Sequence, residues 1–199
     1  MNISKKEFAE KIVIAVREEC ENQKITQGAI AVSFAGIDNI SESFTFPVVV
    51  GSSTVCYDKD GRELGDAAGV AAMKIASAIK AIEYHTSIKP YPGRSKYTSG
   101  ALPEEFVGQG RTNWKGGIGV PIGILIGGHC GCMGTELFKI CVAVSGGSQD
   151  QDEVAAWAAL DVIREVIDSE AGYMLGRDFL KKYDCVDGEV DRYQESSEG

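Results

Sequence analysis

The stretch from residue 116 to residue 153 constrains the fold more than any other part of this chain. Two apolar runs of β-strand type, Gly117 to Ile126 and Leu137 to Val144, flank a turn rich in glycine and cysteine. A corner of sequence Ser145-Gly146-Gly147-Ser148 then opens an acidic helix start. Glycine at this density indicates a backbone that approaches a ligand, a subunit or another strand closely, or that turns with positive φ. The two runs predict an antiparallel hairpin.

The rest of the chain alternates between helical and strand patterns. Asp66 is expected to cap an alanine-rich helix that packs closely on a sheet. Residues 36–46 are polar and are expected to be irregular. The expected helices span residues 4–22, 67–84 and 148–168, the other expected strands span residues 29–34 and 47–57, and the last helix is expected to bury Val154, Trp157, Leu160, Ile163 and Ile167. This order predicts an α+β fold, an antiparallel sheet of four or five strands with helices packed on it.

The bulk composition limits the possible partners. With 199 residues, 44% of them hydrophobic, the chain can bury one core, and we expect a single domain over residues 1–183 and a flexible acidic tail over residues 184–199. The formal charge of -9 argues against a nucleic-acid partner and against an anionic membrane surface. Six cysteines without a recognisable signal peptide indicate a reducing, cytoplasmic location.

One short segment carries soft metal ligands. His129, Cys130 and Cys132 lie on the turn between the two apolar runs, and imidazole with thiolate suits zinc, copper or iron. No second cluster with zinc spacing occurs in the sequence. The segment is therefore a candidate metal or haem site, with buried structural thiols or a subunit contact as the alternative.

Four further positions are candidates for binding a small molecule. His85 is expected at the end of the second helix, where it would act as a ligand, a general base or simply a cap. Arg111 and Trp114 close a long connection over residues 86–113, and cationic and aromatic residues on one loop can hold an acidic or planar ligand. A solvated loop anchored by the tryptophan is the plain alternative. Gly117 begins the glycine-rich run that would approach the ligand.

The corner at Ser145 and Gly146 is a candidate anion site. Backbone N–H groups at a helix start can bind a carboxylate or a phosphate. The alternative is a tight strand-to-helix turn in which Ser148 caps the helix. Neither Walker nor Rossmann glycine spacing is present, so nucleotide binding by those motifs is unsupported.

Three fragments together carry a family resemblance. They are Ala72 to Ala76 in the long helix, Gly116 to Ile122, and Ile140 to Gly147 with the Gln149 to Glu153 helix start. In this order and spacing they resemble the GlcG/HbpS-like family, also called the haem-degrading domain family. The resemblance implies a profilin-like α+β fold, oligomers, and haem binding or links to corrinoid or glycolate metabolism. Corrinoid-linked relatives carry a haem-ligating histidine in the first helix, whereas residues 4–21 here contain none.

These observations support a leading hypothesis and two alternatives. The leading one is a homo-oligomer that binds a small ligand, either haem, a related cofactor or a small organic acid, between the long connection and the glycine-rich hairpin. The first alternative is an enzyme that uses His129 or Cys130 on a small acid or a porphyrin. The second is a structural oligomer subunit whose glycines serve packing alone.

Overall fold

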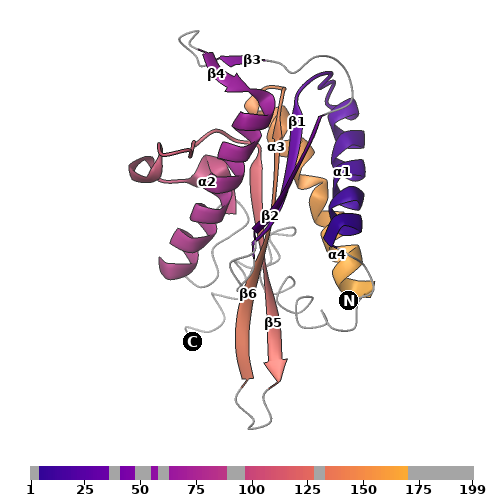
Figure 1. Cartoon of the computed structure of the whole chain (residues 1–199), viewed down its shortest axis with the longest axis vertical. Helices are drawn as coiled ribbons and strands as arrows, with labels where there is room; N and C mark the ends of the chain where they lie inside the picture. The colour runs from indigo at the N-terminus through magenta and orange to yellow at the C-terminus, as the bar shows by residue number, and fades with distance from the viewer. Residues whose placement is uncertain are drawn as a thin grey trace, which may run out of the picture.

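A four-stranded antiparallel sheet in the order β2-β1-β6-β5 lies at the centre of the molecule (Figure 1). The computed structural model describes residues 5–35, 41–47, 55–57, 63–88, 97–127 and 133–169. The central strands are β1 (Ala29–Ala35), β2 (Ser41–Pro47), β5 (Gly117–Gly127) and β6 (Met133–Ser145), while β3 (Val55–Tyr57) pairs separately with β4 (Glu63–Asp66). The helices are α1 (Lys5–Asn22), α2 (Ala67–Ile88), α3 (Gln149–Trp157) and α4 (Ala159–Ser169), with 3-10 turns η2 (Ser99–Ala101) and η3 (Glu104–Phe106).

Helices cover both faces of the central sheet. α1, α3 and α4 lie on one face and α2 lies on the other (Figure 1). This arrangement confirms the predicted α+β class. The predicted hairpin is also confirmed, because β5 and β6 pair in continuous antiparallel register from Gly117↔Ala143 to Gly127↔Met133. No helix in the described ranges is long and apolar enough to cross a membrane.

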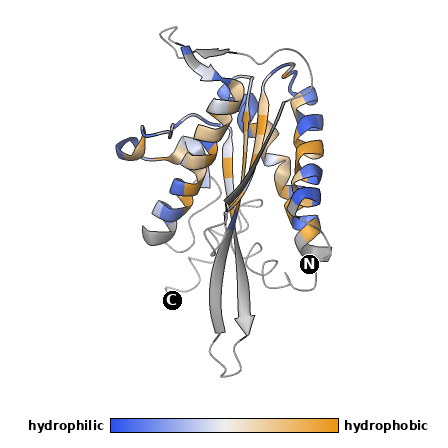
Figure 2. Cartoon of the chain, in the orientation of Figure 1, coloured by the Kyte–Doolittle hydropathy of each residue, from blue (hydrophilic) through white to orange (hydrophobic). Residues whose placement is uncertain are grey.

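The larger core lies between α1 and the sheet. Phe8, Ile12, Val16 and Cys20 recur at helical spacing and are all buried. The Phe8 ring lies 5.5 Å from the ring of Phe34 in β1. Figure 2 shows hydrophobic and hydrophilic residues alternating along α1, as expected for a helix with one buried side.

The second core lies between α2 and the opposite face of the sheet. The helix begins as predicted, because the Oδ1 atom of Asp66 accepts a hydrogen bond of 2.6 Å from the Gly69 N–H. It continues to Ile88, beyond the predicted end at residue 84. A Cβ at Gly119 would lie 2.5 Å from the Cδ1 atom of Ile82, so this glycine lets α2 lie close to β5.

Two strand predictions are wrong. Residues 36–46 were expected to be irregular, yet β2 covers Ser41–Pro47 and pairs with β1 along its whole length. Phe44 and Phe46 alternate with small polar residues there, which is a strand pattern. Pro47 ends this edge strand instead of beginning the next one, and of the expected strand over residues 47–57 only Val55–Tyr57 is a described strand of its own.

The last helix also differs from its prediction. It is divided into α3 and α4 at Ala158, and Val154, which was expected in the core, is 47% exposed. The buried positions are Asp152, Ala155, Ala156, Ala159, Leu160, Ile163 and Val166. The buried side of this helix therefore begins with the acidic residue Asp152. Hydrophobic spacing alone does not predict this.

Two glycines meet where β1 begins and β6 ends. Gly28 has a φ of 141° and Gly146 has a φ of 155°. A Cβ added to Gly146 would lie 2.0 Å from the Gln27 carbonyl oxygen, and one added to Gly28 would lie 2.1 Å from that of Ser145. The two backbones are therefore in direct contact. The acidic tail expected over residues 184–199 lies outside the described residues.

Candidate functional site

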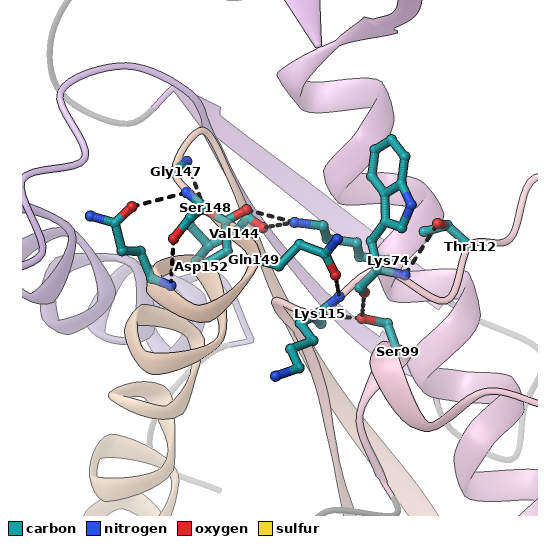
Figure 3. A network of polar contacts seen from close by, with 12 residues as sticks. Lys74, Ser99, Thr112, Lys115, Val144, Gly147, Ser148, Gln149 and Asp152 are labelled. Atoms are coloured by element: carbon teal, nitrogen blue, oxygen red, sulfur yellow. Dashed lines mark hydrogen bonds and ion pairs between the residues drawn. The ribbon is translucent and has the colours of Figure 1, made fainter. Parts of the chain in front are cut away.

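A buried ion pair joins the two helical layers at the end of the sheet where β1 begins and β6 ends. Lys74 comes from α2 and Asp152 from α3, on opposite faces. The Lys74 Nζ atom lies 2.7 Å from the Asp152 Oδ2 atom, and the two side chains are 2% and 4% exposed (Figure 3). Charged residues are almost never buried this far unless they are paired.

Backbone groups complete the environment of this pair. The Lys74 ammonium also donates a hydrogen bond of 2.7 Å to the carbonyl oxygen of Val144 in β6. The Gly147 N–H donates one of 2.8 Å to the Asp152 Oδ1 atom. The pair thus connects α2, the end of β6 and the start of α3 through hydrogen bonds as well as charge (Figure 3).

The Gly116-Gly117 pair makes room for these groups. Gly116 has a φ of 104°, and a Cβ there would lie 2.6 Å from the Asp152 Cβ atom and 2.9 Å from the Lys74 Nζ atom. A Cβ at Gly117 would lie 2.7 Å from the Lys74 carbonyl oxygen. Both glycines are therefore explained by close contact with the chain's own atoms.

The corner at residues 145–148 already holds an anion from within the chain. The Gly147 N–H binds the Asp152 carboxylate, and the Ser148 N–H donates to the Gln151 Oε1 atom. Ser148 caps the helix as predicted, and it does so in a capping box with Gln151. Ser145 is buried and pairs with Ala29 of β1. The N–H groups of Gly147, Ser148 and Gln151 are thus engaged by residues of the same turn.

Residues 97–116 form a loop fastened to α2, here named loop 97–116. The Thr112 N–H donates a 2.7 Å hydrogen bond to the Ser77 hydroxyl, which in turn donates to the Met73 carbonyl oxygen. The Ser99 hydroxyl donates to the Trp114 carbonyl oxygen and accepts a 3.0 Å hydrogen bond from the Gly117 N–H. Two serines thus hold the loop against the helix and against the start of β5.

The Arg111 guanidinium on this loop is only partly engaged by hydrogen bonds to the described residues. The residue is half-buried and follows a tight turn in which Gly108 and Arg111 exchange two backbone hydrogen bonds. Among the described residues its buried Nε atom has no hydrogen-bond partner, and its Nη2 atom lies 3.4 Å from the Gln109 Oε1 atom. Within the described ranges no carboxylate lies at ion-pair distance from Arg111.

His85 lies near the other end of the same loop. Its Nε2 atom is 3.4 Å from the Ala101 carbonyl oxygen, and its ring lies 5.0 Å from that of Tyr84. The loop attaches at Ser77 near Arg111, and eight residues of helix separate Ser77 from His85, a rise of about 12 Å. The four predicted contacts therefore lie along α2 and loop 97–116, but at different positions along the helix axis. They are His85, Arg111, Trp114 and Gly117.

Lys115, by contrast, is already paired. Its Nζ atom lies 2.7 Å from the Asp150 Oδ1 atom and 3.8 Å from the Glu153 Oε2 atom. The hydrogen bond to Asp150 and the charges of Asp150 and Glu153 raise the pKa of Lys115 above its ordinary value. The ammonium is exposed, so the pair is of the surface type that stabilises little.

The predicted metal ligands His129, Cys130 and Cys132 lie outside the described residues. Elsewhere, in the ranges that the structure describes, no group of three His, Cys, Asp or Glu side chains could hold a metal ion. α1 contains no histidine, and the His85 Nε2 atom faces a carbonyl oxygen. Among the described residues the structure thus shows no preformed cluster of metal ligands, and His85 is the one histidine there.

Reasoning from the sequence missed Lys74 and Asp152. A usable signal exists for Lys74, because it lies among Val70, Ala71, Ile75 and Ala78 on the buried side of a helix. A lysine in that position requires a buried partner. Asp152 gives no such signal, since acids in the first turn of a helix are common.

Fold and site together define an α+β domain whose two helical layers are joined by a buried ion pair. No family model and no curated protein matches the chain. It is similar to the structure of Klebsiella pneumoniae protein ORFY, described with family model DUF336, at 17% identity and a TM-score of 0.40 over 78% of this chain and 86% of that one.

Two further solved structures are similar to the chain. The PduOC–haem complex matches at 14% identity and a TM-score of 0.41, over 81% of this chain and 95% of that one. The Ybr137w protein matches at 12% identity and a TM-score of 0.36, over 80% and 79%. With identities and TM-scores this low, the likenesses carry no argument about the site or its ligand.

Proposed function

We propose that this protein is an oligomer that binds a small ligand carrying a carboxylate, and that Arg111 on loop 97–116 recognises it. The supporting observation is the state of the Arg111 side chain. Within the part of the chain that the structure describes, its buried Nε atom has no partner, although the chain has a net charge of -9 and many carboxylates. A buried donor left unpaired costs about 1–3 kcal/mol, and a ligand carboxylate would remove that cost.

The chemistry of arginine supports a carboxylate in particular. The planar guanidinium presents its N–H groups as a fork that matches the two oxygens of a carboxylate. Loop 97–116 is held by Ser77 and Ser99, so the arginine starts from a positioned backbone. A positioned donor loses less conformational entropy on binding.

The other predicted contacts enter this proposal with different roles. Trp114 would supply an aromatic surface beside the ligand, and His85 a second polar group further along α2. The Gly117 N–H donates to Ser99, and the Gly147 N–H, next to Gly146, donates to Asp152. Gly117, Ser145 and Gly146 would therefore contribute shape complementarity to the ligand and not hydrogen bonds.

Haem enters as one member of this ligand class. The family resemblance implies it, and its propionate groups are carboxylates that an arginine can bind. The described residues contain no cluster of metal ligands, so the proposal rests on carboxylate recognition. An axial bond from His129 or Cys130 stays a prediction from the sequence.

The test uses glycolate as a small acid and hemin as an acidic porphyrin. Binding of glycolate is followed by ligand-observed NMR, and binding of hemin by the absorbance of its Soret band. Arg111→Gln should weaken binding of the bound probe about tenfold or more, equivalent to about 1.4 kcal/mol. Lys11→Gln, which removes an exposed charge on α1, should leave binding unchanged. Equal binding by Arg111→Gln and the parent protein would overturn the proposal.

A structural subunit without a ligand is the second candidate. The observation that favours it is the set of glycines at 28, 116, 117, 119 and 146, because each one is explained by contact with the chain's own atoms. If neither probe binds the parent protein while it associates, this candidate replaces the first.

A further inference from the structure

The turn that precedes Arg111 has an uncommon backbone conformation. Gly108 and Arg111 exchange backbone hydrogen bonds of 3.0 and 3.1 Å, which leaves Gln109 and Gly110 as a two-residue turn between them. Both have a positive φ, 52° and 80°, as a type I′ turn requires. Asparagine, aspartate and glycine are the usual residues at the first of these positions. Other residues are strained there, and such strain is concentrated at ligand-binding sites.

The side chain of Gln109 gives this strained position a role. Its Oε1 atom lies 3.4 Å from the Nη2 atom of Arg111. A guanidinium only donates hydrogen bonds, so a glutamine amide contacts it through its oxygen. The contact is longer than an ordinary N–H···O hydrogen bond of about 2.7–3.2 Å, and the amide oxygen has no formal charge. Gln109 therefore lies at the guanidinium without neutralising it.

The surroundings of the turn leave room for a small acid. Gln109 and its two neighbouring glycines are exposed. A Cβ added to Gly108 or to Gly110 would meet no described atom within 4 Å. On the other side of Arg111, the Thr112 N–H is bonded to the Ser77 hydroxyl. The Gln109 amide can therefore move away from Arg111 while the backbone that carries the arginine stays in place.

We infer that the Gln109 Oε1 atom occupies the position that one carboxylate oxygen of the ligand takes at Arg111, and that the ligand displaces it. This inference rests on the proposed function, because it concerns the same arginine. Gln109 is a positioning residue, since it acts on the ligand through Arg111. Its neutrality is essential. A carboxylate of the same shape at this position would pair with Arg111 and compete with the ligand.

The test compares two substitutions of Gln109, with glycolate followed by ligand-observed NMR and hemin by its Soret band. Gln109→Glu keeps the shape and adds a charge, so it should weaken binding of the bound probe about tenfold or more. Gln109→Ala removes the competing oxygen, and it should bind the probe as tightly as the parent protein or up to about threefold more tightly, because one hydrogen bond contributes little net free energy in water. A glutamine needed only for the structure of the turn would give losses in both variants.

A control and a measurement without ligand complete the test. Ile14→Glu adds the same charge at an exposed position of α1, on the other face of the sheet, and should leave binding unchanged. In ¹⁵N NMR spectra of the free protein, the Nε–H resonance that disappears in Arg111→Gln should shift in Gln109→Glu, since the arginine then has a charged partner within the chain.

The outcomes separate this inference from the proposed function. If Gln109→Glu binds the probe as tightly as the parent protein, or if Gln109→Ala binds it about tenfold more weakly, the role of Gln109 is wrong. The proposed function still stands in that case, provided that Arg111→Gln loses binding. If Arg111→Gln binds like the parent protein, or if neither probe binds the parent protein, the proposed function and this inference are both wrong.

Discussion

Lys74 and Asp152 reach each other from helices on opposite faces of the sheet. Taking two charges out of water is costly, and their attraction offsets that cost only when the geometry is good and the remaining donors and acceptors are satisfied. Val144 and Gly147 supply such partners here. The pair therefore fixes the position of α2 relative to α3. Its effect on stability is largest when only one of the two partners is removed.

Replacing Lys74 by Met should lower the free energy of unfolding by about 3–5 kcal/mol, because the Asp152 carboxylate stays buried without its counter-charge. The double variant Lys74→Met/Asp152→Asn buries no charge, and the asparagine oxygen still accepts the Gly147 N–H. It should be more stable than Lys74→Met alone. Urea unfolding followed by circular dichroism measures both values. A double variant that is less stable than either single one would contradict this account.

The buried thiols of Cys20 and Cys141 should not react with thiol reagents in the native state. Burial raises the pKa of Cys20 and of Cys141 from 9.0 to about 12. With Cys56, Cys130, Cys132 and Cys185 changed to Ser, the native protein should not react with Ellman's reagent at pH 8, and both thiols should react in guanidinium chloride. A native reaction at the rate of a free thiol would show that the core opens readily.

The same pKa values set a direction for stability at high pH. Between pH 9 and about 12 the unfolded thiols lose protons that the folded thiols keep. Stability therefore falls as the pH rises through this window. The fall should be shallower when Cys20 and Cys141 are replaced by Ala, and an identical slope would contradict the assignment.

At the scale of single residues, the sequence predicted positions but not pairings. Asp66 and Ser148 were identified as caps because capping acts between residues three apart in the chain. Lys74 and Asp152 are 78 residues apart, and only the folded sheet brings them together. Whether the candidate residues bind a ligand still awaits the experiment on Arg111.

At the scale of elements, the Gly116-Gly117 link between loop 97–116 and β5 sets how close α2 can lie to the sheet. Gly116→Ala should destabilise the protein more than Gly108→Ala, by roughly 2 kcal/mol or more, the range of core overpacking. The two glycines have nearly the same φ, 104° and 103°, but a Cβ at Gly108 meets nothing within 4 Å. Thermal unfolding of both variants measures the difference. Equal losses would mean that backbone conformation alone requires glycine at Gly116.

The elements that were predicted correctly share a clear local pattern. β5 and α1 have a long apolar run or regular helical spacing, so the sequence identified them with nearly correct ends, whereas β6 begins at Met133, four residues before its predicted start. β2 was missed because its alternation spans few residues beside a polar segment. The division at Ala158 was missed because alanine-rich sequence reads as one continuous helix.

At the scale of the whole molecule, the proposed self-association has to overcome the mutual repulsion of chains with a net charge of -9. Salt screens this repulsion and does not weaken apolar contact, so an oligomer held by apolar contacts should become tighter as ionic strength rises from about 0.02 M to about 0.5 M. Sedimentation velocity at fixed protein concentration measures the change. Dissociation by salt would indicate contact through ion pairs instead.

The main-chain contact between Gly28 and Gly146 limits how this domain can be re-engineered. A library randomised at either position should return glycine, since every other residue would push two turns apart.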